Sequence, residues 1–204
     1  GLIAAGAVMG AGPAQAFVGA PYLDERVAEG EIPPVAERLP QEPRIVRLAE
    51  MGRVPGRHGG TVRMLIGGQR DVRYMPLNGY SRLVGYDAQL NFVPDILASY
   101  EVEEGRIFTL RLRRGHRWSD GHPFTSEDFR YCWEDVILHD KLGGMVRELM
   151  IEDRGPRFEV LDEHSVRYSW HAPLPDFLPG LAAPVPLRLF LPAHYMRGFH
   201  EKYQ

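Results

Sequence analysis

The stretch that decides the fold is FTLRLRRGHRWSDGHPFTSEDFRYCWED, which runs from Phe108 to Asp135. Apolar and polar residues alternate at its start, up to Leu112, and this period of two predicts a half-buried strand. Asp120-Gly121 predicts a tight turn, because glycine accepts a positive φ. Thr125 and Asp128 have the spacing of a capping box, and apolar residues at helical spacing follow them. The stretch therefore predicts a strand, a turn and a capped helix that share one core.

Short elements are predicted on both sides of this stretch. A strand is expected at Val62–Ile66, and a loop follows it to Tyr74. One hairpin turn is expected at Glu103–Arg106 and a second around Asp162–His164. Short helices or turns are expected at Ile45–Met51, Tyr80–Val84, Val146–Ile151, Asp176–Leu181 and Ala193–Phe199.

Composition places the chain among ordinary globular proteins. It has 204 residues, of which 44% are hydrophobic and 25% charged. The formal net charge of −3 gives no general attraction to nucleic acid, so no nucleic-acid partner is predicted. The single cysteine, Cys132, excludes an intrachain disulfide. Because it falls on the apolar stripe of the predicted helix, a buried and inert thiol is expected.

The N-terminus has the pattern of an export signal. Leu2–Ala11 is a short apolar run, and Ala14-Gln15-Ala16 after it fits a small-residue cleavage site. Residues 1–16 are therefore interpreted as the remnant of a signal peptide, with a functionless Ala/Gly leader as the alternative. No cysteine follows the site, so a lipoprotein is not predicted. Residues 17–58 are rich in proline and are expected to form an extended arm.

The sequence holds no pattern typical of a catalytic or metal site. Ser119, Asp120, His116 and His122 stand close together in sequence, but neighbours within one turn rarely reach the geometry of a catalytic triad. His194 and His200 are six residues apart, which is not the spacing of a zinc pair on one helix face. The sequence predicts no catalytic residue, no metal ligand and no cofactor.

Four segments, in this order, resemble one protein family. They are Gly59–Arg63, Leu83–Asp87 with Val93–Tyr100, Ile107–Asp128, and Val166–Leu181. The third matches the pattern F-x-L-R-x-G-x-x-W-S-D-G-x-P-x-T-x-x-D. The chain resembles the extracellular solute-binding proteins of peptide- and nickel-type ABC importers, bacterial solute-binding protein family 5. It departs from the family in length and at Tyr74-Met75-Pro76, where L-D-P is common.

The resemblance implies a fold and a function. The fold is an α/β, periplasmic-binding-protein-like lobe with a mixed sheet and flanking helices. Residues 59–204 form its first part, and the second lobe lies beyond Gln204. The function is that of a periplasmic substrate-binding component, not an enzyme, which closes over a peptide or similar polar solute. Its partners are that small-molecule or oligopeptide ligand and an ABC permease in the inner membrane, and the protein is expected to be monomeric.

The predicted ligand contacts lie in the loop after the first strand. Loops at the C-terminal ends of strands line the cleft in open α/β sheets. The residues expected to contact ligand are Gly68, Gln69, Arg70, Asp71 and Tyr74. The alternative for this segment is a solvated surface loop. For the whole protein, the alternatives are a secreted hydrolase and a structural or interaction domain without ligand. The absence of a G-x-S-x-G elbow argues against a hydrolase.

Overall fold

The computed structural model describes residues 17–74, 80–144 and 146–204. The predicted signal peptide and Met75-Pro76 lie outside the described residues. The chain divides into two compact units, Gly1–Arg38 with Pro55–Gly60 and Leu39–Val54 with Thr61–Gln204. The first unit holds the short helices η1 (Pro21–Leu23), α1 (Asp24–Ala28) and α2 (Val35–Arg38), none of which has a buried residue. The boundary of the proline-rich arm at residue 58 stays a prediction.

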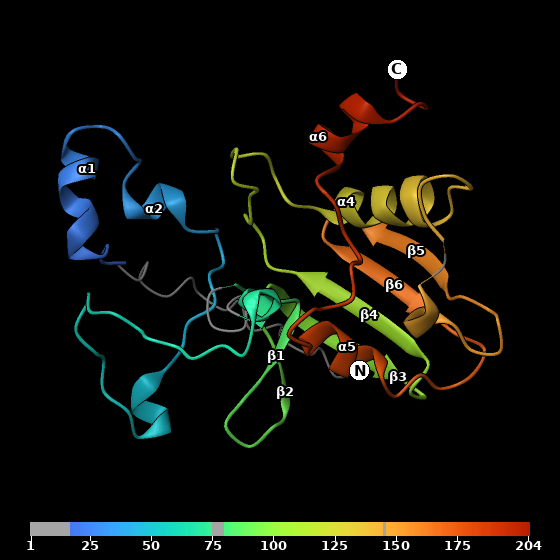
Figure 1. Ribbon diagram of the computed structural model, residues 1–204, viewed down its shortest axis with the longest axis horizontal. Coiled ribbons are helices and arrows are strands. Elements are labelled where there is room, and N and C mark those ends of the chain that lie inside the picture. The colour runs from blue at the N-terminus through green and yellow to red at the C-terminus, as the bar shows by residue number, and fades with distance from the viewer. Residues whose placement is uncertain (1–16, 75–79, 145) are drawn as a thin grey trace, which may run out of the picture. The chain divides into compact units, whose positions relative to one another are not determined.

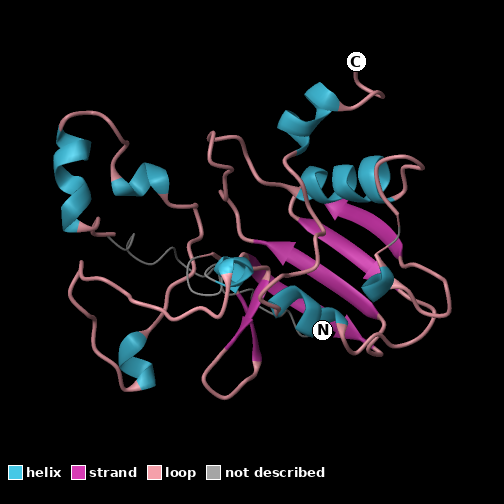
Figure 2. Ribbon diagram, viewed as in Figure 1, coloured by secondary structure: helices cyan, strands magenta, loops and turns pink. Residues whose placement is uncertain are grey.

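The second unit is built on a four-stranded sheet with the strand order β3-β4-β6-β5 (Figures 1 and 2). Its strands are β3 (Leu97–Glu103), β4 (Ile107–Leu112), β5 (Arg157–Asp162) and β6 (Ser165–Ser169). Both predicted hairpins are confirmed, since β3 pairs with β4 and β5 pairs with β6. The α/β fold class is confirmed too. Every strand pair that the structure describes is antiparallel, so the mixed strand directions are not found among them.

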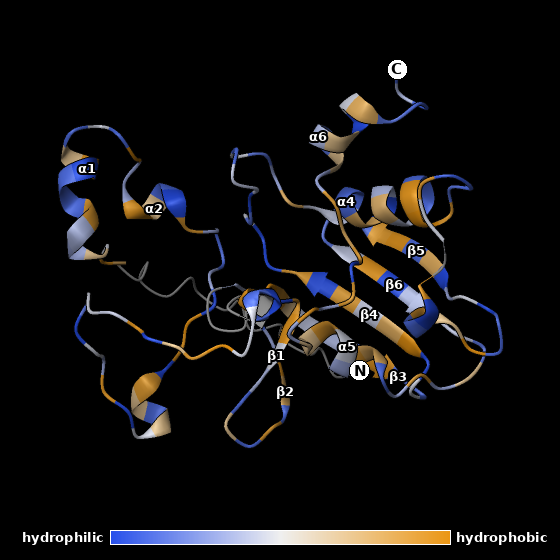
Figure 3. Cartoon of the chain, in the orientation of Figure 1, coloured by the Kyte–Doolittle hydropathy of each residue, from blue (hydrophilic) through white to orange (hydrophobic). Residues whose placement is uncertain are grey.

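The core lies on one face of this sheet. Phe108, Tyr168 and Phe158 are cross-strand neighbours on three adjacent strands. Trp133 packs against Phe158 and Tyr168, while Phe177 packs against Phe108 and Tyr168. The covering helices are α4 (Ser126–Arg130), η4 (Tyr131–Ile137) and α5 (Phe177–Ala182). Hydrophobic residues gather along these strands and helices in Figure 3.

The predicted turn and capped helix are confirmed in detail. Gly121 has a φ of 89°, and the His122 amide donates to Asp120 Oδ1 at 3.0 Å. The Thr125 side chain accepts from the helix start while Asp128 bonds back to the Thr125 amide, so both halves of the capping box are present. The predicted apolar stripe is buried, but the helix widens into π-helical turns at η4, which the pattern did not predict.

Cys132 lies within η4 and is buried, as predicted. Burial raises the pKa of its thiol to about 12, and the sulfur donates to the Arg188 carbonyl at 3.8 Å. A thiol in this environment stays protonated near neutral pH, which fits a packing role.

The remaining elements are short. A separate two-stranded hairpin pairs β1 (Val84–Tyr86) with β2 (Phe92–Pro94). The helix or turn expected at Tyr80–Val84 therefore gives way to a strand at its last residue, Val84. The other helices are η2 (Leu48–Met51), η3 (Gln69–Tyr74), η5 (Arg147–Leu149), α6 (Ala193–Met196) and η6 (Arg197–Phe199). No helix in the described part of the chain is long and apolar enough to cross a bilayer.

The predicted strand at Val62–Ile66 is wrong for this structure. The segment has no strand assignment, and its apolar side chains are exposed, with Val62 at 86% and Leu65 at 103% relative exposure. The alternation favours a strand, but a strand forms only when a neighbour pairs with its backbone. The described backbone gives this segment no such neighbour.

Candidate functional site

The predicted ligand loop forms a short 3₁₀ turn on the surface. The Gly68 amide donates to Asp71 Oδ2 at 2.9 Å, and the Asp71 amide donates to the Gly68 carbonyl at 3.0 Å. Asp71 therefore holds its own turn. Gln69 and Arg70 are exposed, and no contact of their side chains is found within the described residues. The side chain of Tyr74 lies outside the part of the chain that the structure describes.

All five predicted residues lie close to one another in the chain, with Gly68 directly before η3 and the other four within it. The structure does not place them after a strand, since Val62–Ile66 is unpaired. Their assignment as ligand contacts stays a prediction.

The turn that contains Trp118 and Asp120 meets the C-terminal segment of the described chain. His194, at the start of α6, brings its Nε2 to 2.6 Å from Asp120 Oδ2. The hydrogen bond from His194 lowers the pKa of the Asp120 carboxyl below its ordinary value. The His194 ring also stacks on the His122 ring, with centroids 3.9 Å apart and planes inclined by 2°.

This arrangement is not a catalytic triad. His122 Nδ1 lies 3.1 Å from the Pro123 carbonyl, and no described contact joins Ser119 to either histidine. A nucleophile without a base in hydrogen-bond reach is not activated. The interpretation of this turn as structural, with Asp120 capping it and Trp118 packed on the core, fits the contacts of Asp120 with the His122 amide and of Trp118 with Phe124. It missed His194, which is 74 residues from Asp120 and carries no local signal of the contact.

Asp128 is the acceptor for three separate parts of the chain. Its Oδ2 accepts from the Thr125 amide at 3.0 Å and from the Trp118 indole nitrogen at 3.2 Å. Its Oδ1 accepts from the Ala193 amide at 3.0 Å. The side chain is buried, and its backbone carbonyl also accepts from the Leu191 amide. One carboxylate therefore joins the Trp118 turn, the helix start and the approach to α6.

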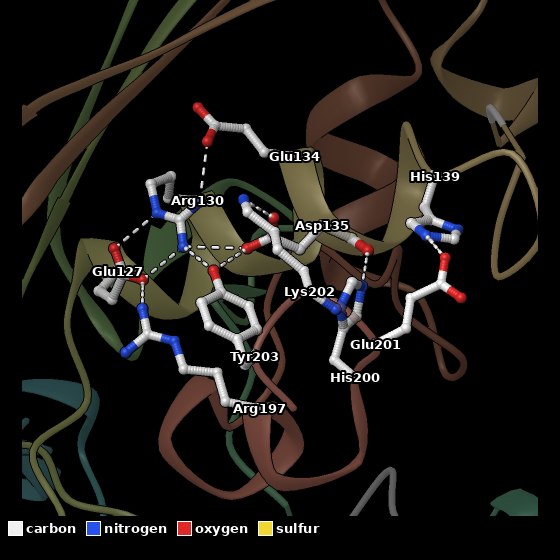
Figure 4. A network of polar contacts seen from close by, with 10 residues as sticks. All are labelled: Glu127, Arg130, Glu134, Asp135, His139, Arg197, His200, Glu201, Lys202 and Tyr203. Atoms are coloured by element: carbon white, nitrogen blue, oxygen red, sulfur yellow. Dashed lines mark hydrogen bonds and ion pairs between the residues drawn. The ribbon is translucent and has the colours of Figure 1, made fainter.

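A second acidic residue, Asp135, holds the last residues of the chain against η4 (Figure 4). It accepts from Lys202 Nζ at 2.5 Å, from the Tyr203 hydroxyl at 2.7 Å and from Arg130 at 3.0 Å. Burial alone raises the pKa of this carboxyl, but the three donors outweigh burial and hold the pKa at about 2. The Asp135 carbonyl accepts from His200 Nε2 at 2.7 Å.

The same network continues to the helix start. Glu127 binds Arg130, its neighbour on α4, and also Arg197 of η6 (Figure 4). Glu127 of α4 and Asp135 of η4 thus pair with cations of the C-terminal segment, Arg197 and Lys202. Their geometry serves attachment, and no group of three or more metal-ligating side chains lies within binding reach in the described ranges.

Comparison with known proteins decides the family. The family model described as bacterial extracellular solute-binding proteins, family 5 Middle, matches residues 91–195. The chain belongs to this family. The matched span holds the Trp118 turn, Asp128 and His194, so the junction just described lies inside the family's region.

Individual relatives agree with this assignment. The periplasmic alpha-galactoside-binding protein of Rhizobium meliloti (strain 1021) is 27% identical over 87% of this chain and 28% of its own length. The periplasmic oligopeptide-binding protein OppA of Escherichia coli (strain K12) is 23% identical over 45% of this chain and 19% of its own length.

Solved structures give the same fold. An oligopeptide-binding protein OppA superposes with a TM-score of 0.71 and 29% identity, covering 93% of this chain and 29% of the other. The periplasmic binding protein MelB of Agrobacterium fabrum C58, solved in complex with stachyose, superposes with a TM-score of 0.66 and 24% identity, covering 90% and 30%. The chain thus spans less than a third of the length of these relatives.

Proposed function

We propose that this protein is the periplasmic substrate-binding component of an ABC importer. It captures a peptide or a similar polar solute by closure of two lobes and delivers it to a permease in the inner membrane. Export through the signal peptide, the absence of a lipid anchor and a monomeric state belong to this proposal.

The main support for the proposal is that residues 91–195, which include most of the packed core, match the family model of solute-binding proteins. Relatives that cover nearly the whole of this chain are named as binding proteins. The polar clusters support binding rather than catalysis, because their carboxylates are taken up by contacts between segments. Asp128 and Asp135 are the clearest examples.

The ligand is proposed to meet the loop from Gly68 to Tyr74. Its exposed amide and guanidinium groups, from Gln69 and Arg70, suit the carbonyls and the terminal carboxylate of a peptide. Asp71 contributes by holding the turn, since its carboxylate is bound to the Gly68 amide.

A second ligand class is favoured by a separate observation. Among the sequence relatives, one that aligns over 87% of this chain is named for alpha-galactosides, and the Escherichia coli OppA aligns over 45%; an OppA structure covers 93%, so both ligand classes are represented among relatives that span most of the chain. An α-linked oligosaccharide is therefore the second candidate, and its hydroxyl groups suit the same amide and guanidinium donors.

A thermal-shift screen of the full-length protein tests both candidates. Oligopeptides of two to five residues and alpha-galactosides such as stachyose are added to separate samples. A ligand that binds only the folded state raises the melting temperature in a concentration-dependent way. Confirmation comes from calorimetric titration with the best compound. No shift with any member of either class, at millimolar ligand, contradicts the proposal.

The loop is tested with a matched pair of variants. Gln69→Ala removes an exposed amide in the proposed site, and Gln89→Ala removes an exposed amide from the β1–β2 turn. The proposal expects about a tenfold loss of affinity for Gln69→Ala and none for Gln89→Ala, because a hydrogen bond to ligand contributes about 1–1.5 kcal/mol. Equal affinities in both variants would remove the loop from the site.

A further inference from the structure

The stacked histidines and Asp120 form a cluster that the proposed function does not use. The rings of His122 and His194 lie face to face with centroids 3.9 Å apart. His194 Nε2 is 2.6 Å from Asp120 Oδ2, and its Nδ1 is buried without a described partner. The cluster joins the Trp118 turn to α6, two segments that are otherwise linked through Asp128.

The geometry does not suit a metal ion. Nitrogen lone pairs lie in the plane of an imidazole ring, so two parallel rings aim them along separate planes. They cannot converge on one cation at coordination distance. Any effect of the two histidines on the contact between α6 and the Trp118 turn therefore comes from the charge of their rings, not from a bound metal.

The charge of this cluster changes with its protons. Histidine is the side chain whose ordinary titration falls between pH 5 and 8. Asp120 stays ionised through that range, because the hydrogen bond from His194 lowers its pKa. One proton on the pair is balanced by Asp120. A second proton places two imidazolium rings face to face with a single carboxylate beside them, and like charges at this separation repel.

We propose that His122, His194 and Asp120 form an acid-sensitive clasp, which holds α6 against the Trp118 turn near neutral pH and loosens when both rings carry a proton.

Other charged groups around the clasp are already engaged. On the turn, Arg117 donates to the Gly121 carbonyl at 3.4 Å. On η6, Arg197 is bound to Glu127 of α4. The buried carboxylate of Asp128 is likewise engaged, since it accepts from the Trp118 indole and from the Ala193 amide. Among the contacts that the structure describes, Asp120 supplies the carboxylate that meets His194.

Amide hydrogen exchange of the full-length protein, read by mass spectrometry at pH 7.0 and 5.5, tests the clasp. After correction for the chemical exchange rate, the amides of residues 193–199 are expected to open several-fold more often at the lower pH. His122→Phe keeps a flat ring on His194 but cannot be charged. It is expected to keep the protection seen at pH 7.0 and to abolish the change with pH.

Two further variants make the result specific. His164→Phe alters a histidine in the β5–β6 turn, outside the clasp, and is expected to leave the pH response intact. Asp120→Asn removes the charge that balances the first proton and is expected to reduce protection at both pH values. An unchanged pH response in His122→Phe, or no response in the natural protein, overturns the clasp. The readout needs no ligand, so its failure is separate from failure of the proposed binding function.

Discussion

The sharpest test of the architecture is removal of the Asp128 carboxylate. In Asp128→Ala, three donors lose their acceptor: the Thr125 amide, the Trp118 indole and the Ala193 amide. The first two are partly exposed and can recruit water, so each loss costs about 1 kcal/mol. The Ala193 amide is buried, and its orphaned donor costs about 2 kcal/mol. The expected loss is about 4 kcal/mol, a large fraction of the roughly 5–15 kcal/mol typical of a folded domain.

Urea unfolding followed by tryptophan fluorescence measures this loss through the shift of the midpoint at constant slope. Asp128→Asn keeps one acceptor oxygen and is expected to lose about 2 kcal/mol. Glu134→Ala is the matched control, because it removes a half-exposed carboxylate of the same helix that pairs with Arg130. Its expected loss is below about 0.5 kcal/mol. A loss for Asp128→Ala as small as that of Glu134→Ala would refute the view that one carboxylate serves three segments.

Three further predictions concern the core, a close approach and pH. Tyr168→Phe deletes a fully buried hydroxyl that has no described partner, so the melting temperature should stay level or rise; a clear fall would show that the hydroxyl is satisfied. Gly143→Ala should cost about 1–3 kcal/mol, because the added Cβ would stand 2.1 Å from the Val136 carbonyl oxygen, whereas Gly144→Ala has open space and should cost less. Asp135, with its pKa at about 2 against an ordinary 3.8, contributes about 2 kcal/mol that is complete above about pH 4 and lost as the pH falls through about 2. Stability measured against pH should therefore decline less steeply over that window in Asp135→Asn.

The sequence predicted the parts of the fold that rest on local signals. The alternation at β4, the Asp120-Gly121 turn and the capping box of Thr125 each need only a few neighbouring residues, and all three are present. It did not predict the contacts that join Asp120 to His194 or Asp128 to Ala193, which span 74 and 65 residues. Such contacts depend on how distant elements pack against each other, and no local pattern in a single sequence indicates which residues will meet.

The failure at Val62–Ile66 has a different cause. Alternating residues indicate that a segment can form a strand, but the strand forms only when a second segment hydrogen-bonds to its backbone. The prediction that the ligand loop follows a strand fails with that strand. The turn of the loop is held by Asp71, a contact that the sequence alone did not indicate.

The exposed run from Val62 to Ile66 also bears on the colloidal behaviour of the chain. Its apolar side chains meet water on a backbone whose amides and carbonyls are unpaired in the described structure. An exposed apolar segment with strand-like alternation can pair with the same segment of another copy, and this pairing grows with concentration. We expect such pairing to lower the solubility of the chain at high concentration. Leu65 is fully exposed, so replacing it with a charged residue is expected to keep concentrated samples monodisperse without disturbing the core.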